Sequence, residues 1–448
     1  MYMANLQTAA RDRILKLLDS GSFVEIGAYI TARADAGKPE AKADGDGVIT
    51  GYGTVNGCLV YVFSQNSDVN GGSIGEMHAK KISNIYSMAV SMGAPVIALI
   101  SSAGVRMNES NDSLYSFGRI YKHQAEASGV VPQVYGIFGP CGGGLAVSAA
   151  MADFVYMDKE NGKLFLNSPN AVTGNYTEKC DTSSAVFQAE ETGVVDAIGS
   201  EDEIIEGIRD LVSVLPSNNE EDLSADITDD DLNRAVAGIE SMKDKSEMIK
   251  QISDNGKFIE LKKEYSPSMA AGFIRINGRT VGVLANKKPQ LCPCGCTKAV
   301  KFLKFCDAFN IPVLTLADVE GFAKKMTAEQ RLGGLLGQLT ALYATATVPM
   351  VTVVTGSAYG TAGIAMGSKA VGADIVYAWT GAKMGLMDAD ILDSIGGNGA
   401  ANTALANAQR GYVDDIIAPA ETRQRVAAAF EMLYTKNVAV PVRKHGTI

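Results

Sequence analysis

The chain of 448 residues contains two copies of one sequence pattern. The apolar segment around Pro95, "APVIALISSAG", resembles the segment around Pro312, "IPVLTLADVEG". The segment around Pro132, "VPQVYGIFG", resembles the segment around Pro349, "VPMVTVVTG". Both pairs lie 217 residues apart, and a fixed spacing between similar segments is the sequence signature of a repeated structural unit.

Two further pairs extend the repeat on either side. Asn56 in "GYGTVNG" matches Asn277 in "GFIRING", and Asp153 in "ADFVYM" matches Asp374 in "ADIVYA". Each of these pairs lies 221 residues apart. Four matched blocks in the same order predict two copies of one domain.

Each copy alternates apolar, strand-like segments with helix-like segments. That alternation predicts an α/β fold with a mainly parallel sheet covered on both faces. We expect the first domain at residues 1–216 and the second at residues 257–448. An acidic connecting segment is expected at residues 217–256. The stretch from Leu215 to Ala235, "LPSNNEEDLSADITDDDLNRA", is expected to be solvated.

The net charge and the hydropathy of the chain argue against nucleic-acid-binding, secreted and membrane-spanning proteins. The formal net charge is −10 and no long basic run occurs, so nucleic acid is not an expected partner. The first residues are too polar for a secretory signal peptide, and no apolar run reaches the ~18 residues that span a bilayer. We therefore expect a soluble, cytoplasmic protein.

The seven cysteines do not indicate a disulfide framework, because their number is odd and no secretion signal is evident. Three of them form "CPCGC", at Cys292, Cys294 and Cys296. A zinc ribbon needs two C-x₂₋₄-C pairs, and no second pair follows. We expect no metal site, and the role of these three thiols stays open.

The stretch "GGSIGE" matches the G-x-S-x-G pattern that places a nucleophilic serine, here Ser73, on a strand-to-helix turn. The chain has three histidines, His78, His123 and His445, and a serine triad in the hydrolase order would need His123 or His445 as its base. His123 lies in a polar helical stretch and His445 near the end of the sequence. We therefore expect Ser73 to have a turn role only.

Glycine-rich turns follow the apolar strands in both copies. They read "SSAGVR" and "GPCGGGLA" in the first copy, and "ADVEGF" and "TGSAYGTAG" in the second. Small residues let a backbone approach a ligand, and the first N–H groups of a helix have no internal partner. One N–H group from each turn of a pair can bind one developing oxyanion. The sequence therefore predicts one oxyanion hole in each copy.

Several longer motifs resemble a single family. They include "GDGVITGYGTVNG", "GGSIGEMHAKKI", "ASGVVPQVYGIFGPCGGG", "FCDAFNIPVLTLADVEGF" and "QRGYVDDIIAPAETRQRV". They are similar to the carboxyltransferase subunits of biotin-dependent acyl-CoA carboxylases, of the propionyl-CoA carboxylase beta subunit and methylmalonyl-CoA decarboxylase alpha subunit type. This resemblance implies two tandem crotonase-like (ClpP/crotonase) domains.

The resemblance also implies an activity and its site residues. The enzyme would move a carboxyl group between carboxybiotin and a short-chain acyl-CoA, most simply propionyl-CoA or methylmalonyl-CoA. The first copy would bind the acyl-CoA and the second would bind biotin. The acyl-side residues carried over from the family are Ala103, Gly104, Val105, Gly142, Gly143 and Gly144. The biotin-side residues are Gly360, Thr361 and Ala362, with Glu320 or Gly321 opposite. Ile364 falls where the family shapes the acyl pocket, and an aliphatic residue there fits a short acyl group.

Biotin would be carried on a separate protein, since the chain lacks the A-M-K-M attachment motif and has only "GAKMGL". The resemblance implies a biotin carboxyl carrier protein, and a biotin carboxylase or a membrane decarboxylase subunit, as partners. It also implies a homo-hexamer in which the two copies meet across a subunit interface. Departures from the family pattern gather in the second copy, at Thr361, "ADVEGFAKKM" and "LCPCGC", and could alter carrier recognition or activity.

Three other functions stay open at this stage. The first is the carboxyltransferase subunit of a sodium-pumping methylmalonyl-CoA or glutaconyl-CoA decarboxylase, which runs the same chemistry in reverse. The second is a stand-alone crotonase-like hydratase or hydrolase with Glu109 or Glu320 as its base. The third is a non-catalytic scaffold.

Overall fold

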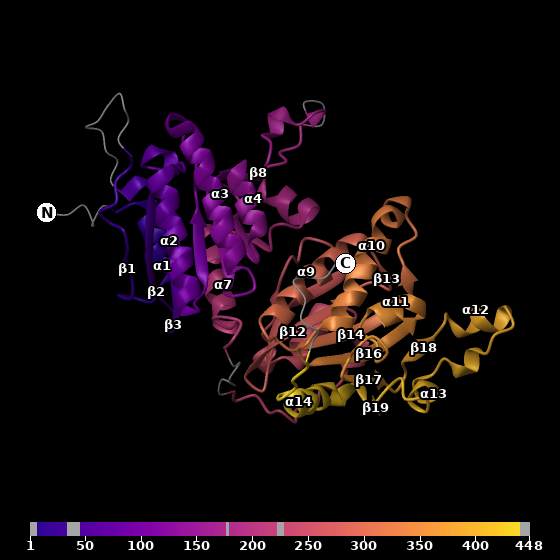
Figure 1. Cartoon of the computed structure of the whole chain (residues 1–448). Coiled ribbons are helices and arrows are strands. Elements are labelled where there is room, and N and C mark those ends of the chain that lie inside the picture. Colours follow the sequence, from indigo (N-terminus) through magenta and orange to yellow (C-terminus); the bar gives the residue numbers. More distant parts are fainter. Residues whose placement is uncertain (1–6, 34–44, 176–178, 222–227, 440–448) are drawn as a thin grey trace. The chain divides into compact units, whose positions relative to one another are not determined.

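The computed structural model describes residues 7–33, 45–175, 179–221 and 228–439. The chain forms two compact units, Met1–Glu221 and Asp222–Ile448. Each unit has its own sheet with helices packed against it, as Figure 1 shows by the sequence colours.

The sheet of the first unit has seven strands in the order β1-β2-β3-β4-β5-β7-β9. The pairs β1–β2 and β2–β3 are antiparallel, and all later pairs are parallel. Two short strands, β6 and β8, form a separate parallel pair. The bounds are β1 Val24–Glu25, β2 Val48–Val55, β3 Cys58–Gln65, β4 Val96–Ile100, β5 Gln133–Ile137, β6 Pro140–Gly142, β7 Phe154–Asp158, β8 Lys163–Phe165 and β9 Ala197–Gly199.

The sheet of the second unit follows the same plan, in the order β10-β11-β12-β14-β16-β17-β19. Again the first two pairs are antiparallel and the rest parallel. The bounds are β10 Ile259–Glu260, β11 Met269–Ile276, β12 Arg279–Asn286, β13 Gln290–Leu291, β14 Val313–Val319, β15 Gly321–Phe322, β16 Met350–Tyr359, β17 Ile375–Trp379, β18 Lys383–Gly385 and β19 Asp415–Ile417. The identical order confirms the predicted internal duplication.

Helices occupy matching places between the strands of the two sheets. In the first unit they are α1 Ala9–Leu17, α2 Glu76–Met92, α3 Ser110–Ala127, α4 Gly144–Met151, α6 Ala185–Phe187 and α7 Glu201–Val214. In the second they are α8 Lys245–Ile252, α9 Pro293–Ala308, α10 Met326–Thr345, α11 Gly360–Ala365, α12 Ala389–Ser394, α13 Ala404–Ala408 and α14 Thr422–Leu433. In the first unit, α4 follows β5 and its turn. In the second unit, α11 stands at the matching place, after β16.

The repeated Asn-Gly dipeptides close the antiparallel hairpins. Asn56 and Gly57 have φ of 50° and 83°, and Asn277 and Gly278 have φ of 54° and 72°. A two-residue hairpin turn with two positive φ values is the type that matches strand twist, and Asn-Gly is its preferred sequence. The dipeptide therefore fixes the register of β2 with β3 and of β11 with β12.

A carboxylate and an arginine brace each hairpin turn. In the second unit, Asp254 accepts the N–H groups of Asn277 (3.2 Å) and Gly278 (2.7 Å), and Arg423 donates to Asp254 at 2.7 Å. In the first unit, Asp19 accepts the same two turn amides, and Arg209 donates to it at 3.0 Å. Arg423 is fully buried, whereas about a quarter of the Arg209 side chain is exposed.

Two more aspartates in each unit accept amides at the amino ends of the parallel strands. Asp153 accepts the N–H of Gln133 at 2.9 Å, and its repeat partner Asp374 accepts the N–H of Met350 at 2.7 Å. This contact is the physical reason for the repeated Ala-Asp pair that the sequence shows. Asp196 and Asp414 accept the N–H groups of Val155 and Val376 in the next strand of each sheet.

Part of the expected connecting segment is buried. Val236, Ile239, Met248, Ile249 and Ile252 belong to the apolar core of the second unit. These residues follow the stretch Leu215–Ala235 that is expected to be solvated, and α8 places Met248, Ile249 and Ile252 in the core. The domain extents 1–216 and 257–448 stay a prediction.

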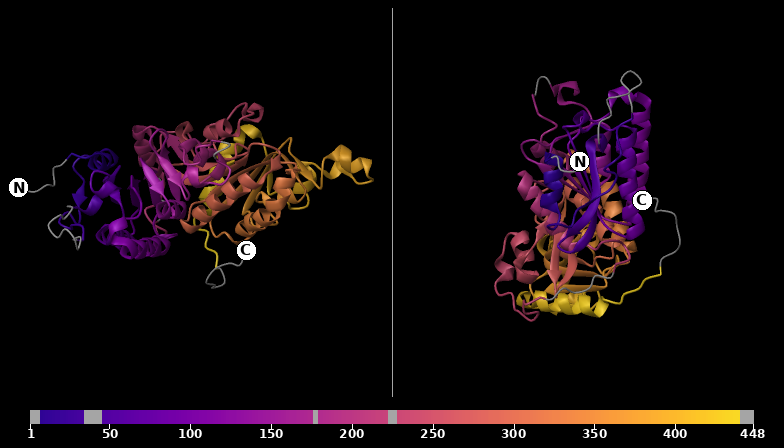
Figure 2. Two further views of the ribbon diagram at one scale, coloured as in Figure 1. Left: turned by 90° about the horizontal axis from the view of Figure 1, so that it is seen from above. Right: turned by 90° about the vertical axis from the view of Figure 1, so that its left-hand side faces the viewer.

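In the second unit, the segment between β18 and α13, which contains α12, extends away from the sheet (Figures 1 and 2). Its helix α12 and the residues around it expose large apolar side chains, namely Leu386, Ile391 and Ile395, each more than half accessible. Among the described residues, none of the helices combines the length and the apolar character needed to span a bilayer.

Removing the buried brace should destabilise the second unit strongly. We expect Asp254→Ala to lower its free energy of unfolding by about 3 kcal/mol, because the buried Arg423 loses its partner at 2.7 Å and keeps only Asp230, at 3.5 Å. The single tryptophan, Trp379, reports this change, since it is buried and donates to Thr422, the neighbour of Arg423, at 2.9 Å. The measurement is urea unfolding followed by tryptophan fluorescence.

Asp19→Ala is the matched control for this prediction, and its unfolding in urea is followed by circular dichroism because Trp379 lies in the other unit. The same brace in the first unit is partly exposed, so its loss should cost only about 1 kcal/mol. Equal effects of the two substitutions would contradict the assignment of the large cost to burial of Arg423.

Candidate functional site

Two turns of the first unit meet at the carboxyl edge of its parallel strands. One follows β4 at Ser101–Arg106, and the other follows β5 and leads through β6 into α4. The N–H of Ser102 donates to the carbonyl of Pro140 at 2.9 Å. A Cβ atom built on Gly104 would lie 3.9 Å from the carbonyl oxygen of Gly142. The two predicted turns are therefore in contact.

Three of the predicted acyl-side amides already have acceptors. The N–H of Gly143 donates to Phe165 at 2.9 Å, that of Ala103 to Gly71 at 2.9 Å, and that of Gly104 to the Ser102 hydroxyl at 3.1 Å. These bonds hold the turns in shape, and they leave these three N–H groups no free role toward a ligand in this conformation.

The N–H groups of Val105 and Gly144 differ from these three. Within the described residues, neither has a backbone or side-chain acceptor. Gly144 is the first residue of α4, so its N–H is one of the amides that a helix leaves unpaired. One free donor thus comes from each turn, which is the arrangement an oxyanion hole requires.

The glycines of "CGGG" serve different purposes. Gly143 has φ 59° and ψ −119°, a conformation that favours glycine, and a Cβ built on it would meet nothing within 4 Å. A Cβ on Gly144 would lie 2.9 Å from the ring of Phe117, and one on Gly142 would lie 2.6 Å from the ring of Phe165. Gly143 therefore borders open space, while Gly142 and Gly144 are required for packing.

In the second unit the matching turns follow β14 and β16. The N–H groups of Glu320 and Gly321 both approach the carbonyl of Pro289, at 2.7 and 3.3 Å. Gly360 begins α11 with φ 54°, as Gly143 precedes α4 with φ 59°. Of the other predicted biotin-side residues, Ala362 is buried and Thr361 is exposed. Ile364, the residue predicted to shape the acyl pocket, is exposed.

A buried ion-pair cluster, which we call the Arg106 cluster (Asp46, Arg106 and Glu109), lies directly beside Val105. The Arg106 guanidinium pairs with Asp46, and it lies 3.0 Å from Glu109. Only 4% of Arg106 and none of Asp46 is exposed. Burial raises the pKa of Asp46, against the opposing effect of Arg106. Sequence reasoning missed Asp46 and Arg106; an arginine right after a glycine turn was the available signal.

Three residues considered in the sequence analysis, Ser73, His78 and Glu109, lie in or near this cluster. The Ser73 hydroxyl donates to the carbonyl of Asn70 at 2.6 Å and accepts from Arg106 at 3.3 Å. His78 is fully buried, and burial lowers its pKa to about 3, so it stays neutral. The Glu109 carboxylate accepts the N–H of Glu76 at the start of α2, at 2.6 Å. Each of them is engaged in holding local structure.

A second polar cluster, also missed by sequence reasoning, joins β14 to β16. The buried ammonium of Lys245 lies 3.3 Å from the Asp318 carboxylate and donates to the Thr355 hydroxyl at 2.9 Å. Asp318 also accepts the N–H of Ser357 at 2.9 Å. The 217-residue spacing places Asp318 opposite Ser101 of the first unit, so the two copies differ in charge at this position.

The cysteine stretch begins helix α9. Cys292 is its N-cap and accepts the N–H of Gly295 at 3.4 Å, and the Ser268 hydroxyl lies 3.0 Å from its sulfur. Burial acts to raise the pKa of Cys292, but these hydrogen bonds outweigh it and the pKa falls below its usual value. No group of three or more metal-ligating side chains occurs in the part of the chain that the structure describes.

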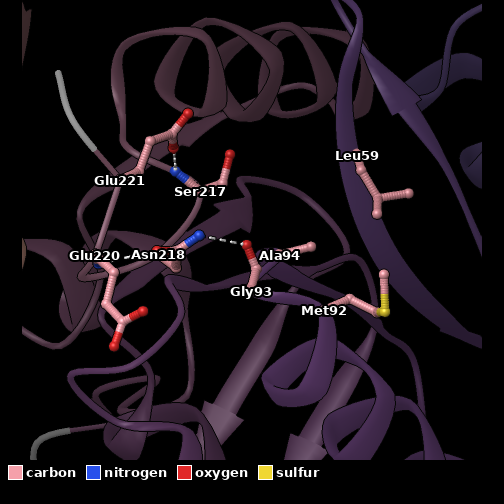
Figure 3. A pocket seen from close by; sticks show the side chains of 8 residues that line it. All are labelled: Leu59, Met92, Gly93, Ala94, Ser217, Asn218, Glu220 and Glu221. Atoms are coloured by element: carbon pink, nitrogen blue, oxygen red, sulfur yellow. Dashed lines mark hydrogen bonds between the residues drawn. The ribbon is translucent and has the colours of Figure 1, made fainter. Parts of the chain in front are cut away.

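A cavity of about 370 Å³ lies elsewhere in the first unit (Figure 3). It is lined by Leu59, Met92, Gly93, Ala94, Ser217, Asn218, Glu220 and Glu221. Leu59 and Ala94 stand at the amino ends of β3 and β4, so the cavity lies at the sheet edge opposite the glycine turns. It is separate from the candidate site.

Known proteins resemble this chain over nearly its whole length. It is 40% identical to a propionyl-CoA carboxylase beta chain of Roseobacter denitrificans, over 98% of this chain and 93% of that protein. It is 37% identical to the methylmalonyl-CoA decarboxylase subunit alpha of Propionigenium modestum, over 99% of this chain and 94% of that protein.

A solved structure shares the fold. The transcarboxylase 12S hexamer core, crystallised with hydrolyzed methylmalonyl-coenzyme A, matches with a TM-score of 0.90 and 34% identity. The match covers 98% of this chain and 92% of that one. The predicted crotonase-like fold is thereby confirmed.

The description "carboxyl transferase domain" belongs to the family model that matches residues 4–395. That match covers most of the chain and includes the glycine turns of both units. Together with the relatives above, it shows that the chain is an enzyme of the carboxyl transferase domain family.

Proposed function

We propose that this enzyme transfers a carboxyl group between biotin and a short-chain acyl-CoA, with propionyl-CoA or methylmalonyl-CoA as the acyl substrate. The observation that carries the proposal is the pair of free N–H groups, Val105 and Gly144, on two touching turns of the first unit. The names of the relatives support the choice of acyl group.

The two amides suit the chemistry of the acyl substrate. Adding or removing a carboxyl group at the α-carbon of a thioester places negative charge on the thioester oxygen. Val105 and Gly144 would donate to that oxygen where the charge develops. Removing one such donor typically costs about 3–4 kcal/mol of transition-state stabilisation.

The turn at Gly360 is the candidate biotin site of the second unit. Biotin, when bound, supplies the ureido nitrogen that carries the carboxyl group. The residues fit such a group: a Cβ built on Gly321 would meet nothing within 4 Å, so that turn is open. Thr361 is exposed at the start of α11, and its N–H and that of Ala362 are the proposed donors to the ureido oxygen.

We further propose that biotin arrives on a separate carrier protein and that the chain acts as a hexamer. The exposed apolar side chains around α12 (Leu386, Ile391 and Ile395) support assembly, because such side chains gathered on a projecting segment indicate a protein interface. The solved transcarboxylase is a hexamer by its description. A biotin carboxylase, or a membrane decarboxylase subunit, would then set the direction of the reaction.

The decarboxylase direction is the second candidate function, favoured by the relatives named methylmalonyl-CoA decarboxylase subunit alpha. A hydratase or hydrolase with a glutamate base has less support. Glu109 is held between Arg106 and the start of α2, and the Glu320 side chain is exposed.

The proposed activity can be measured directly. Purified protein should move a carboxyl group between methylmalonyl-CoA and a biotinylated carrier, and more slowly to free biotin. Transfer is followed with labelled carboxylate, and avidin-blocked carrier is the control. The proposal fails if no transfer or decarboxylation occurs with acetyl-, propionyl-, methylmalonyl- or glutaconyl-type thioesters in the presence of the carrier.

Gly143 and Ser73 should respond very differently to substitution. Gly143→Val forces a branched residue into a positive-φ conformation and fills the open space beside the Gly144 amide, so turnover should fall at least about 100-fold. Ser73→Ala removes two hydrogen bonds of the hydroxyl, each worth about 1 kcal/mol of stability, and no group that reacts, so turnover should fall at most about five-fold. Circular dichroism checks that both variants fold. An inactive, folded Ser73→Ala protein would instead support a serine nucleophile.

The hexamer proposal predicts that two inactive variants restore activity together. Gly143→Val disables the acyl-side turn and Gly360→Val, at the matching position of the repeat, disables the biotin-side turn. If each active site uses the first unit of one subunit and the second unit of another, co-expression should return part of the activity. Confirmed mixed oligomers without activity, or an active monomer in light scattering, would contradict this arrangement.

A further inference from the structure

The Arg106 cluster (Asp46, Arg106 and Glu109) lies next in the chain to one of the two free donors. Arg106 follows Val105 directly, so whatever fixes the backbone of Arg106 also fixes the position of the Val105 amide. We propose that Arg106 is a positioning residue for the acyl-side donor, with Asp46 and Glu109 holding its guanidinium. This inference rests on the proposed function.

Side-chain contacts hold the guanidinium on several sides. It pairs with Asp46, donates to the carbonyl of Ser73 at 2.5 Å, and lies 3.0 Å from Glu109. The carboxylate of Glu109 reaches onward to the first amide of α2, at Glu76. The side chain of Arg106 therefore cannot move without moving the start of α2.

Backbone hydrogen bonds also fix Arg106 and the turn that precedes it. The N–H of Arg106 donates to Ile74 at 3.0 Å, and Ile74 donates to Gly104 at 2.8 Å. The carbonyl of Arg106 accepts the Ser113 hydroxyl at 2.9 Å. These bonds surround Val105 on both sides and leave its own N–H as the free group.

The repeat supplies an internal control. In the second unit the same bridge forms between Leu291 and Phe322, and Ala323 donates to Leu291 at 2.9 Å. Ala323 stands where Arg106 stands in the first unit, 217 residues earlier. The fold therefore closes this turn without an arginine, so the ion pair is not required by the architecture.

The turns differ in conformation where the cluster is absent. Gly104 has φ 88°, whereas its counterpart Gly321 is not among the glycines with positive φ. In the second unit the amides of Glu320 and Gly321 approach the carbonyl of Pro289, whereas their counterparts Ala103 and Gly104 donate to Gly71 and to the Ser102 hydroxyl. The Arg106 cluster thus accompanies a different backbone conformation of the residues that precede Val105.

Stability alone is a poor reason for such a cluster. Burying an ion pair costs desolvation that its attraction scarcely offsets, and apolar replacements are often neutral or stabilising. Asp46 also has φ 51°, which is uncommon for a residue other than glycine. The function that we infer for the cluster is to fix the position of the Val105 amide.

The test uses the full-length oligomer with Arg106→Met, Arg106→Lys and a control, Arg209→Met. Arg209 is also paired with an aspartate in the first unit but lies at the hairpin turn. We expect kcat for carboxyl transfer to fall about 10- to 100-fold in Arg106→Met, less in Arg106→Lys, and at most two-fold in Arg209→Met. Lysine keeps the charge beside Asp46 but lacks the fork that also reaches Ser73.

Measurements of ligand binding distinguish the loss of a positioned Val105 donor from general damage to the site. Calorimetry should give a Kd for propionyl-CoA within about three-fold of wild type in Arg106→Met, at full stoichiometry. The Kd for a nitro analogue of the acyl thioester, whose nitronate anion resembles the enolate, should rise about 10- to 100-fold, because only the charged form needs the aligned donor. Equal weakening of both ligands, or no change in either, overturns the inference.

Glu109→Gln serves if Arg106→Met does not fold. It keeps an oxygen acceptor for the N–H of Glu76 and removes the charge that faces Arg106, so it should weaken nitronate binding several-fold and leave propionyl-CoA binding unchanged. An unchanged nitronate Kd in this variant overturns the inference. A wild-type protein without transfer activity would reject the proposed function, whereas an active wild type with unaffected Arg106 variants rejects only the role of Arg106.

Discussion

The parallel pairing of neighbouring strands is the constraint on which both candidate sites depend. β4 pairs with β5 from Val96 to Ile100, and β14 pairs with β16 from Val313 onward. Parallel strands end at one edge of a sheet, so the turns that follow them must meet there. Because these strands are buried almost throughout, a shifted register would expose apolar side chains. The sheet thereby keeps in contact two turns that lie far apart in the sequence.

Carboxylates support this arrangement from the opposite edge. Asp153 and Asp374 accept amides at the amino ends of β5 and β16, and Asp19 and Asp254 brace the hairpin turns. These contacts occur at matching places in both units. At the carboxyl edge the two units differ, because other carboxylates accept amides there: Glu109 that of Glu76 in the first unit, and Asp318 that of Ser357 in the second. The anchors at the amino edge are thus shared by the two units, and those at the carboxyl edge are not.

The two units have diverged in the residues that hold the turns. The first uses a buried arginine with two carboxylates, and the second uses Lys245 and Asp318 with the carbonyl of Pro289. Both devices join segments far apart in the sequence. A carboxyl transfer places negative charge on two chemically different oxygens, and unlike turns suit unlike ligands. The two units therefore share one fold, but different side chains hold the glycine turns in each.

The sequence by itself determined the duplication, the alternation of strands and helices, the Asn-Gly hairpins and the family, because these depend on local pattern or on long motifs. It also located the glycine turns at Gly104, Gly143 and Gly360. Only the tertiary structure decided which amides stay free. The N–H of Gly143 is taken by Phe165 through the pairing of β6 with β8, and Arg106 meets Asp46 across 60 residues of chain. The charged residues of both signs between Glu240 and Lys250 likewise concealed an apolar helix face that packs into the core. Hydrogen-bond acceptors and burial come from distant segments, so no local pattern could reveal them.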